Sequence, residues 1–371
     1  MRILIVGGGV LGTLHAWAAV ERGHQVVQLE REAEARGASV RNFGLVWVGG
    51  RAAGDELATA VRARRHWERI GERVPDLGFR ANGSLTLVRT EAELAVAREA
   101  AESPDASRGF KLLDAAEARE LNPALRGDFL GALWCERDAA VEPRRAQPAL
   151  RVALTATGRY TWRPGREVRS LTSNGVVDDH GERHEGDVVL LCTGAWLGGL
   201  VREIAGELPV RRVRLQMAQT EPLGEALTTT VADADSFRYY PAYRGPALDG
   251  LAAGQPQGDI AAGHALQLLM VQRLDGSLTI GDTHEYTQPF GFDVTEEPYD
   301  HLAETAAALL GRPLPRIRRR WAGVYAQATG EDAIVHRERL ADNAFLVTGP
   351  GGRGMTCAPA IAEDTAGELG L

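Results

Sequence analysis

Residues 2–12 read Arg-Ile-Leu-Ile-Val-Gly-Gly-Gly-Val-Leu-Gly, and this stretch decides the fold of the chain. The β-branched run 2–6 predicts a buried parallel strand, and the apolar spacing over 10–22 predicts a helix directly after the glycines. Residues 25–30, Gln-Val-Val-Gln-Leu-Glu, predict a second strand. The stretch is therefore expected to form a βαβ unit.

Three glycines between the first strand and the helix give the spacing Gly7-x-Gly9-x-x-Gly12. The first glycine permits a tight turn, the second lets the backbone approach a pyrophosphate, and the third lets the helix pack on the strand. Glu30 follows Gly12 by 18 residues, at the end of the second strand. There a carboxylate can accept hydrogen bonds from ribose hydroxyls and would repel a 2′-phosphate. The motif predicts a site for NAD or FAD and argues against NADP.

Two further segments favour FAD over NAD. Residues 187–196, Asp-Val-Val-Leu-Leu-Cys-Thr-Gly-Ala-Trp, predict a strand that lays backbone beside the dinucleotide. Residues 348–356, Thr-Gly-Pro-Gly-Gly-Arg-Gly-Met-Thr, form a glycine loop before a final helix. Such a loop can direct amides at a flavin pyrimidine, where negative charge develops on reduction. An NAD domain has no need for this closing segment.

The bulk composition excludes several classes of partner. The 371 residues carry a formal net charge of −8, with 44% hydrophobic and 25% charged residues. This charge gives no attraction to nucleic acid or to an anionic membrane, and the arginines at 316 and 318–320 are interpreted as a solvated face or strand edge. The three cysteines have no metal-ligand spacing, so we expect no metal site, no disulfide framework and a cytoplasmic location.

The remaining pattern predicts an α/β fold with a Rossmann-like FAD-binding domain and an inserted mixed β-sheet substrate domain. We assign 1–80, 141–210 and 325–371 to the first domain, and 81–140 and 211–324 to the second. Helices are expected over 53–73, 91–102, 143–155, 299–310 and 358–369. Strands are expected over 84–88, 187–192, 210–220, 237–240, 268–273, 277–281 and 344–347, with short ones near 168 and 176–177.

The whole chain resembles the superfamily of D-amino-acid oxidase, glycine oxidase and sarcosine oxidase. The motifs that carry the resemblance lie between residues 3 and 356. They are Gly7–Gly12 with Glu30, Ser39-Val-Arg-Asn-Phe-Gly44, Val141-Glu-Pro143, Val188–Trp196, Trp321-Ala-Gly323 and Gly349–Gly354. The resemblance implies a glycine oxidase-like fold and FAD held without a covalent bond.

The residues expected at FAD follow from the same resemblance. Val168 matches the residue whose backbone reads the adenine, residues 41–43 match the loop beside the flavin ring, and 351–355 match the loop over its pyrimidine. The full set is Gly7, Gly9, Val10, Leu11, Gly12, Glu30, Arg31, Ser39, Arg41, Asn42, Phe43, Val168, Thr193, Gly194, Trp196, Gly351, Gly352, Arg353, Gly354, Met355 and Thr356.

Three departures from the superfamily pattern bear on the reaction. Glycine oxidase-like members have a carboxylate-clamping arginine after Trp-Ala-Gly, whereas this chain reads Val324-Tyr325. Monomeric sarcosine oxidase has a flavin-linked cysteine where Gly323 and Val324 stand, and Cys357 lies elsewhere. That enzyme also has an oxygen-activating lysine where this chain has Thr279. Oxygen or another acceptor therefore remains open as the electron acceptor.

The chain is more similar to a bacterial branch of the superfamily associated with aminophosphonate breakdown. Residues 215–220 (Leu-Gln-Met-Ala-Gln-Thr), 281–285 (Gly-Asp-Thr-His-Glu) and 349–356 carry this likeness. It implies oxidation of 2-aminoethylphosphonate or its N-methyl form to an imine that hydrolyses to phosphonoacetaldehyde. A phosphonate dianion needs several donors, and the candidates are Arg41, Arg353, His264, His284, Tyr239 and Tyr240.

For catalysis or substrate placement we select Arg41, Tyr240, His284, Tyr325 and Arg353, with hydride transfer from a small polar amine to flavin N5 and no named general base. Each of these residues also has a purely structural interpretation. Three other functions stay open: oxidation of glycine- or sarcosine-like amino acids, oxidation of a hydroxy acid by an FAD dehydrogenase, and electron transfer within a flavoprotein complex.

Overall fold

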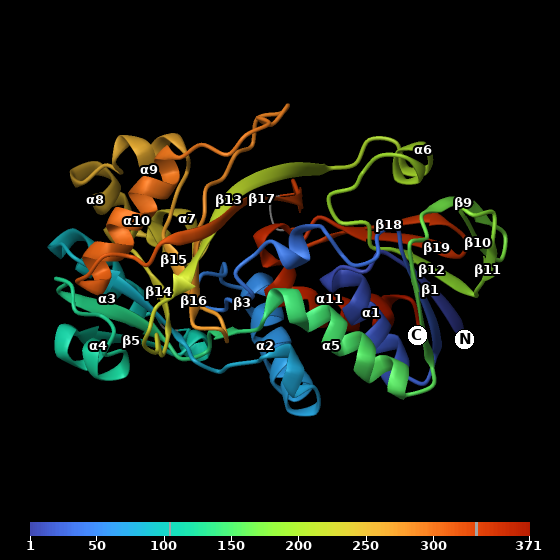
Figure 1. Ribbon diagram of the computed structural model, residues 1–371, viewed down its shortest axis with the longest axis horizontal. Coiled ribbons are helices and arrows are strands. Elements are labelled where there is room, and N and C mark those ends of the chain that lie inside the picture. The colour runs from blue at the N-terminus through green and yellow to red at the C-terminus, as the bar shows by residue number, and fades with distance from the viewer. Residues whose placement is uncertain (104, 331–332) are drawn as a thin grey trace.

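Two large β-sheets lie at opposite ends of the elongated molecule (Figure 1). The computed structural model describes residues 1–103, 105–330 and 333–371. One sheet has six strands and the other has eight, and the long strands β13 (Val210–Pro222) and β17 (Ile317–Ala328) extend from the second towards the first.

The six-stranded sheet has the order β18-β19-β12-β1-β2-β8. Its strands are β1 (Arg2–Val6), β2 (Gln25–Glu30), β8 (Tyr160–Pro164), β12 (Val188–Leu191), β18 (His336–Ala341) and β19 (Ala344–Thr348). Neighbouring strands are parallel except for the antiparallel pair β18–β19. All six lie in the ranges 1–80, 141–210 and 325–371, although the division into domains itself stays a prediction.

The apolar run in β1 is explained by cover on both faces of this sheet. Ile3 and Ile5 pack in one cluster with α1 (Val10–Glu21), α2 (Asp55–Arg73), α5 (Pro143–Ala156) and α11 (Gly354–Glu368). Leu4 and Val6 point the other way, into a cluster that includes Val168 and Val176. Those valines belong to a three-stranded sheet of β9 (Val168–Thr172), β10 (Gly175–Asp178) and β11 (Arg183–Glu185).

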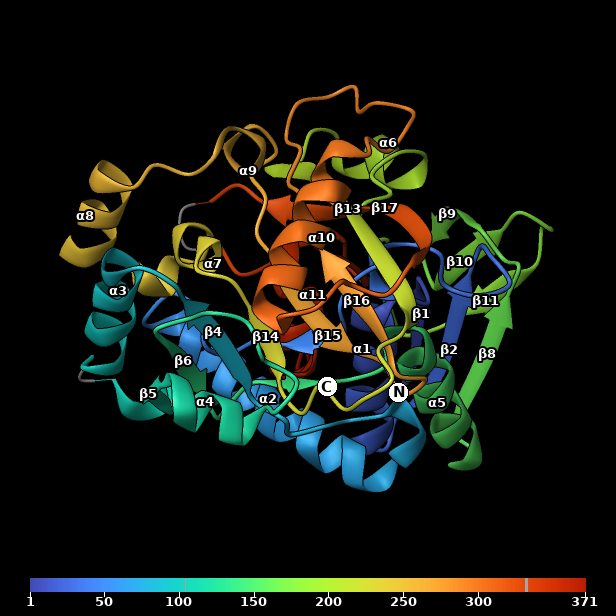
Figure 2. The same ribbon diagram turned by 60° about the vertical axis from the view of Figure 1, so that its left-hand side comes forward.

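The eight-stranded sheet has the order β17-β13-β16-β15-β14-β4-β6-β5. Its other strands are β4 (Ser84–Val88), β5 (Phe110–Asp114), β6 (Gly131–Cys135), β14 (Thr230–Ala232), β15 (Leu269–Gln272) and β16 (Ser277–Gly281). Only β14–β4 is parallel, so the sheet is mixed, as the sequence predicts. Helix α10 (Glu297–Leu310) packs on it through a core that includes Tyr299 and Leu302, and Figure 2 shows this helix in front of β15 and β16.

Most predicted elements agree with the structure to within a few residues, but one was assigned to the wrong class. Residues 237–240 were predicted as a strand, whereas α7 (Asp235–Tyr239) is a short helix ended by Pro241. Aromatic residues favour strands on average. Here Phe237 is fully buried and packs edge-on against Tyr243, with ring centroids 4.8 Å apart. Tertiary packing of one aromatic face therefore outweighed local propensity.

The final helix α11 begins at Gly354, four residues before the predicted start. Pro359 lies inside this helix, and an interior proline leaves the carbonyl four residues earlier without its donor. In the structure that carbonyl belongs to Met355, and Trp67 Nε1 donates to it at 2.9 Å. A tryptophan on α2 thus supplies the missing hydrogen bond and fixes the loop before α11 against the neighbouring helix.

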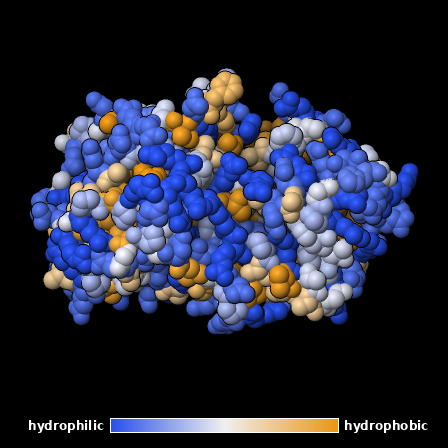
Figure 3. Space-filling view, viewed as in Figure 1, coloured by the Kyte–Doolittle hydropathy of each residue, from blue (hydrophilic) through white to orange (hydrophobic). Residues whose placement is uncertain are grey.

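The smaller elements lie between and around the two large sheets. A two-stranded sheet of β3 (Leu45–Val46) and β7 (Ala139–Ala140) lies between the large sheets, and the helices α3 (Glu91–Ala101), α4 (Ala115–Leu121), α6 (Leu200–Ala205), α8 (Pro246–Gly254) and α9 (Asp259–Gly263) lie outside them. Among the described residues, no helix combines the length and apolarity needed to cross a bilayer. Figure 3 shows apolar residues scattered over the displayed face rather than gathered in one patch.

Candidate active site

A cavity of about 810 Å³ runs from the glycine loop after β1 to strands β13, β15 and β17 of the eight-stranded sheet. It is lined by 17 of the sequence-predicted site residues: Gly9, Val10, Leu11, Ser39, Arg41, Asn42, Phe43, Gly194, Tyr239, Tyr240, His284, Tyr325 and Gly351–Met355. Residues that lie far apart in the sequence therefore meet around one space.

The glycine loop admits no larger residue at two of its three positions. Gly7 has φ +115°, and a Cβ there would lie 2.4 Å from the Cys192 carbonyl oxygen. A Cβ on Gly12 would lie 2.1 Å from the Gly7 carbonyl oxygen. These close approaches seat the N-terminus of α1 against β1 and β12. The first helical amides then point at the cavity, where an anion is favoured.

Glu30 lies where the sequence places it, at the end of β2 beside the glycine loop. It is buried, and one oxygen accepts a hydrogen bond from the Gly8 amide at 2.7 Å while the other accepts from the Glu32 amide at 3.0 Å. Each oxygen retains acceptor capacity for a hydroxyl. Ser39 Oγ accepts from the Val10 amide at 2.9 Å and thereby ties the next loop to the start of α1.

These features fit FAD. The loop that only glycine can form and the buried carboxylate would hold the pyrophosphate and a ribose. Among the described residues, Thr193 Oγ1 and Trp47 Nε1 are buried without a hydrogen-bond partner. The indole N–H can donate to a bound molecule, and the hydroxyl can donate or accept. Gly351 and Gly352 line the far part of the cavity, and Gly351 has φ +61°, which favours glycine.

The loop at 41–44 is held by its own side chains. Asn42 donates to the Ala38 carbonyl at 2.8 Å and accepts from the Gly44 amide at 2.6 Å, and Phe43 is buried. Arg41 is exposed and donates to the Ala322 carbonyl on β17 at 2.9 Å. Arg41 therefore lines the cavity as predicted, and its guanidinium already joins this loop to the strand that carries Tyr325.

Arg353 lies in an ion-pair group that the sequence alone did not reveal. Its guanidinium is 3.2 Å from Glu56, and Glu56 is 3.6 Å from Arg51. Arg51 is buried and also donates to the Trp47 carbonyl at 2.8 Å. Neither Arg51 nor Glu56 lies in a recognisable motif, so nothing in the sequence could have indicated them. Thr356 supports the same group by accepting from the Trp47 amide at 2.9 Å.

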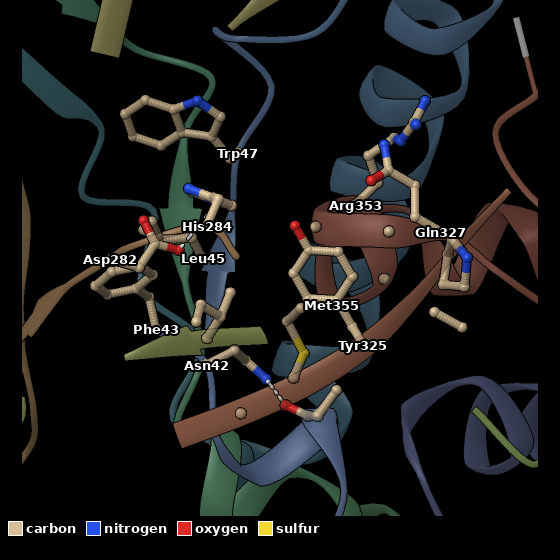
Figure 4. A pocket seen from close by; sticks show the side chains of 18 of the residues that line it. Asn42, Phe43, Leu45, Trp47, Asp282, His284, Tyr325, Gln327, Arg353 and Met355 are labelled. Carbon is tan, nitrogen blue, oxygen red and sulfur yellow. Dashed lines mark hydrogen bonds and ion pairs between the residues drawn. The ribbon is translucent and has the colours of Figure 1, made fainter. Parts of the chain in front are cut away.

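Aromatic rings form one wall of the cavity. The Tyr239 ring stacks on His284 with centroids 4.1 Å apart and meets Tyr240 edge-on at 5.0 Å. Tyr240 in turn lies 5.5 Å from Trp47, and its hydroxyl accepts from Gln267 at 3.3 Å. In Figure 4, Tyr325 points into the space between His284 on one side and Arg353 on the other.

Asp282 is the residue that sequence reasoning missed and that bears most on chemistry. It is buried, lines the cavity, and lies 3.7 Å from His284 Nε2 (Figure 4). Burial raises the pKa of its carboxyl group, and His284 opposes this rise. His284 Nδ1 donates to the Ala265 carbonyl at 3.0 Å, which leaves Nε2 on the Asp282 side. Alternation along the segment 281–285 could have placed Asp282 on the same side as His284.

Three tyrosine hydroxyls and one arginine guanidinium lie near the Asp282–His284 pair. The Tyr239 hydroxyl lies near those of Tyr286 and Tyr325 and partly offsets the rise in their pKa that burial causes. Burial raises the pKa of Tyr239 and Tyr325, so both remain protonated donors at neutral pH. Arg211 lies over the Tyr286 ring at 4.6 Å and donates to Gln327 at 3.2 Å. Neither Arg211 nor Tyr286 was selected from the sequence.

Several predicted residues do not line the cavity described here, and their roles stay predictions. Arg31 lies over the half-exposed Trp196 ring at 4.1 Å, Val168 is in the core, and His264 pairs with Glu297 at 3.3 Å. The others in this group are Gly7, Gly12, Glu30, Thr193 and Thr356. Cys357 is buried within α11 away from the cavity, and burial raises the pKa of its thiol to about 11.

One group outside the cavity has the side chains of a metal site. Asp178, Glu182 and His184 place one ligand atom each within 4.8 Å of the others. Arg166 lies 2.9 Å from Asp178 and 3.0 Å from Glu182. Its guanidinium occupies the position between the two carboxylates, so the group is explained by an ion pair.

Comparison with known proteins identifies the family. The family model for FAD-dependent oxidoreductases, DAO, matches residues 2–367. A glycine oxidase of Pseudomonas aeruginosa is 27% identical over 380 residues, covering 97% of this chain and 92% of the relative. The solved structure of L-proline dehydrogenase from P. horikoshii is 20% identical with a TM-score of 0.79, covering 99% of this chain and 92% of that one. Glycine oxidase from Geobacillus kaustophilus is 21% identical with a TM-score of 0.76, covering 98% and 94%. Together with the glycine loop, the buried Glu30 beside it and the cavity between that loop and β17, these matches show that the chain belongs to the DAO family of FAD-dependent oxidoreductases.

Proposed function

We propose that the chain oxidises a small primary or secondary amine that carries an anionic group, with 2-aminoethylphosphonate or its N-methyl form as substrate. The observation that carries this proposal is Asp282, a buried carboxylate that lines the cavity beside aromatic rings. Its one ion-pair partner among the described residues is His284, at 3.7 Å.

A buried carboxylate without a strong cationic partner is costly unless a ligand compensates it. The nearby Tyr240 and Trp47 rings offer faces that attract a cation. Gln267 Oε1 is buried without a partner among the described residues and can accept an N–H. A substrate ammonium satisfies all three features, whereas a substrate hydroxyl would leave the carboxylate charge uncompensated.

The donors on the other side of His284 suit an anionic group with several oxygens. The hydroxyls of Tyr286 and Tyr325 lie near that of Tyr239, and Arg211 lies over Tyr286. A carboxylate is best held by one bidentate arginine, whereas a phosphonate offers three oxygens to several separate donors. Because the donors come from several side chains, they support a phosphonate. Tyr325 stands where the resemblance places the carboxylate-binding arginine of glycine oxidase-like members.

The residues of the chain prepare the substrate for hydride loss. The bound FAD would accept the hydride, and with it the two electrons that the amine loses. The substrate nitrogen must first lose a proton, because its lone pair stabilises the developing imine. Asp282 is placed to accept that proton, and His284 Nε2 is the next acceptor at 3.7 Å. The aromatic wall excludes water, and the released imine then hydrolyses to an aldehyde and ammonia or methylamine.

The glycine oxidase relative supports a small amine as the substrate. Oxidation of glycine- or sarcosine-like amino acids is the second candidate, since five arginines line the cavity: Arg41, Arg51, Arg211, Arg244 and Arg353. Arg244 is exposed at the surface and has no carboxylate partner among the described residues, so it could hold a carboxylate.

The test is a steady-state survey of the purified yellow protein with a dye acceptor. Substrates are 2-aminoethylphosphonate, its N-methyl form, glycine, sarcosine and glycerol 3-phosphate, and the aldehyde product is trapped as a hydrazone. The proposal predicts phosphonoacetaldehyde from the two aminophosphonates and at least tenfold lower kcat/KM for the others. A preference for glycine or sarcosine would contradict the phosphonate assignment, and turnover of glycerol 3-phosphate alone would contradict the amine. Replacing the dye with oxygen shows which acceptor the protein uses.

A further inference from the structure

A second cavity, of about 240 Å³, lies beside the first and shares Asn42 with it. Its walls come from the loop at Val40, the start of α5 and strands β13, β16 and β17. Five arginines line it, against only two carboxylates, Glu142 and Asp275. The arginines are Arg144, Arg145, Arg273, Arg318 and Arg319.

The carboxylates do not balance these charges. Asp275 pairs with Arg318 at 2.5 Å. Glu142 lies 2.8 Å from Arg80, which is outside the arginine group, and 3.9 Å from Arg273. Arg144 and Arg319 have no carboxylate within ion-pair distance in the described part of the chain. Burial lowers the pKa of Arg144, and the positive charges of Arg319, Arg41 and Arg318 lower it further. The guanidinium groups therefore repel one another across this space.

The start of α5 adds to the same excess of positive charge. This 14-residue helix begins at Pro143 and has Arg144 and Arg145 but no acidic residue in its first turn. Its N-cap residue is Glu142, whose side chain does not hydrogen-bond to the helix amides. Cations at a helix N-terminus oppose the helix dipole, whereas an anion is favoured at that position. An anion in the cavity would relieve both the repulsion among the arginines and this unfavourable placement.

Arg273 supplies a buried donor at the wall of the cavity. Its side chain is nine-tenths buried, and its two amino groups donate to the Phe43 and Val141 carbonyls. Its Nε atom is buried and has no acceptor among the described residues. A buried N–H is rarely left without a partner, so this donor points to a missing acceptor.

We propose that this cavity binds a small oxyanion of the phosphate or phosphonate type, held by Arg144, Arg319 and Arg273. The sequence run 316–320 was interpreted as a solvated face or strand edge, and the fold brings two of its arginines against the helix start. Arg144 Nε donates to the Val40 carbonyl at 3.3 Å, and Arg41 and Asn42 follow in the loop that lines the first cavity. A bound anion would therefore hold Arg144, and through it that loop, in position. This site does not depend on the substrate proposed above.

The test is isothermal titration of the purified holoprotein with inorganic phosphate and, separately, with ethylphosphonate, which has no amine. In the double variant R144Q/R319Q, the Kd of the anion is expected to rise at least 30-fold. In the single variant R319Q, which changes only an exposed residue, it is expected to rise at least fivefold. R316Q is the matched control, because Arg316 pairs with Glu221 and does not line the cavity. It should change affinity less than twofold. Circular dichroism checks that each variant folds.

A fourth variant, R211Q, separates this site from the first cavity. Binding that survives R211Q and is lost in R144Q/R319Q supports the proposal. Tighter binding of phosphate identifies the free ion as the ligand, and tighter binding of ethylphosphonate identifies an organic phosphonate. Absence of saturable binding for both, or binding that R144Q/R319Q leaves unchanged, would overturn it.

Discussion

Replacing Asp282 with asparagine keeps the shape of the side chain and removes the charge that the proposed substrate ammonium meets. A charge pair about 4 Å apart at an effective dielectric constant of about 20 is worth about 4 kcal/mol. Desolvation of the ammonium offsets part of this, which leaves about 2–4 kcal/mol. At 1.36 kcal/mol per factor of ten, kcat/KM for 2-aminoethylphosphonate should fall about 30- to 900-fold.

The assay is rapid mixing of anaerobic protein with substrate, followed at the flavin absorbance band, which gives the substrate Kd and the limiting rate of reduction. Asp233→Asn is the matched control. Asp233 is also buried in the eight-stranded sheet region and accepts from the Leu268 amide at 3.1 Å, but it does not line the cavity. It should change kcat/KM less than threefold. An Asp282→Asn protein within threefold of wild type, or an equal loss in both variants, would refute the reasoning.

The pH dependence follows from the raised pKa of Asp282. The carboxylate must be ionised to hold the ammonium, so kcat/KM of the wild-type protein should fall as pH falls through that raised pKa. The acid limb should be absent in Asp282→Asn. An acid limb that persists unchanged in the variant would assign it to another group.

Three further predictions test the cofactor loop, the anion donors and a buried carboxylate. Gly12→Ala should lose FAD, because its Cβ would lie 2.1 Å from a backbone oxygen, whereas Gly367→Ala, with no atom within 4 Å of the added carbon, should keep a wild-type ratio of flavin to protein absorbance. Tyr325→Phe should raise the KM for an aminophosphonate about 10- to 100-fold, the worth of a hydrogen bond to a charged group, and should leave FAD content unchanged; an unchanged KM would remove Tyr325 from the site. Burial raises the pKa of Asp233 to about 8, so the folded state holds a proton that the unfolded state releases, and stability is lost as pH rises from about 4 through 8. Asp233→Asn should therefore raise Tm more at pH 8 than at pH 5, and equal shifts at both values would count against this.

The cofactor half of the molecule could be predicted from the sequence because its constraints are local. Gly7, Gly9 and Gly12 sit at fixed spacing in one turn, and Glu30 ends the adjacent strand. The steric limits on Gly7 and Gly12 come from the neighbouring backbone, which any chain of this topology places there. Spacing alone is then enough to indicate the chemistry.

The substrate half could be predicted only in part, because long-range packing decides which side chains meet. Asp282 and His284 are two residues apart, yet the significance of Asp282 depends on the rings of Tyr240 and Trp47, which come from distant segments. The short helix α7 was predicted as a strand for the same reason, since burial of Phe237 decides its conformation. No local pattern could indicate such contacts.

The most direct test of the proposed function compares two substrates that differ in one group, 2-aminoethylphosphonate and 2-hydroxyethylphosphonate. Each is mixed anaerobically with the holoprotein, and the rate of flavin bleaching is measured at equal concentration. The account predicts full bleaching by the amine and at least 100-fold slower bleaching by the alcohol, because only an ammonium compensates Asp282. Equal rates, or bleaching by the alcohol alone, would contradict amine oxidation as the function of this cavity.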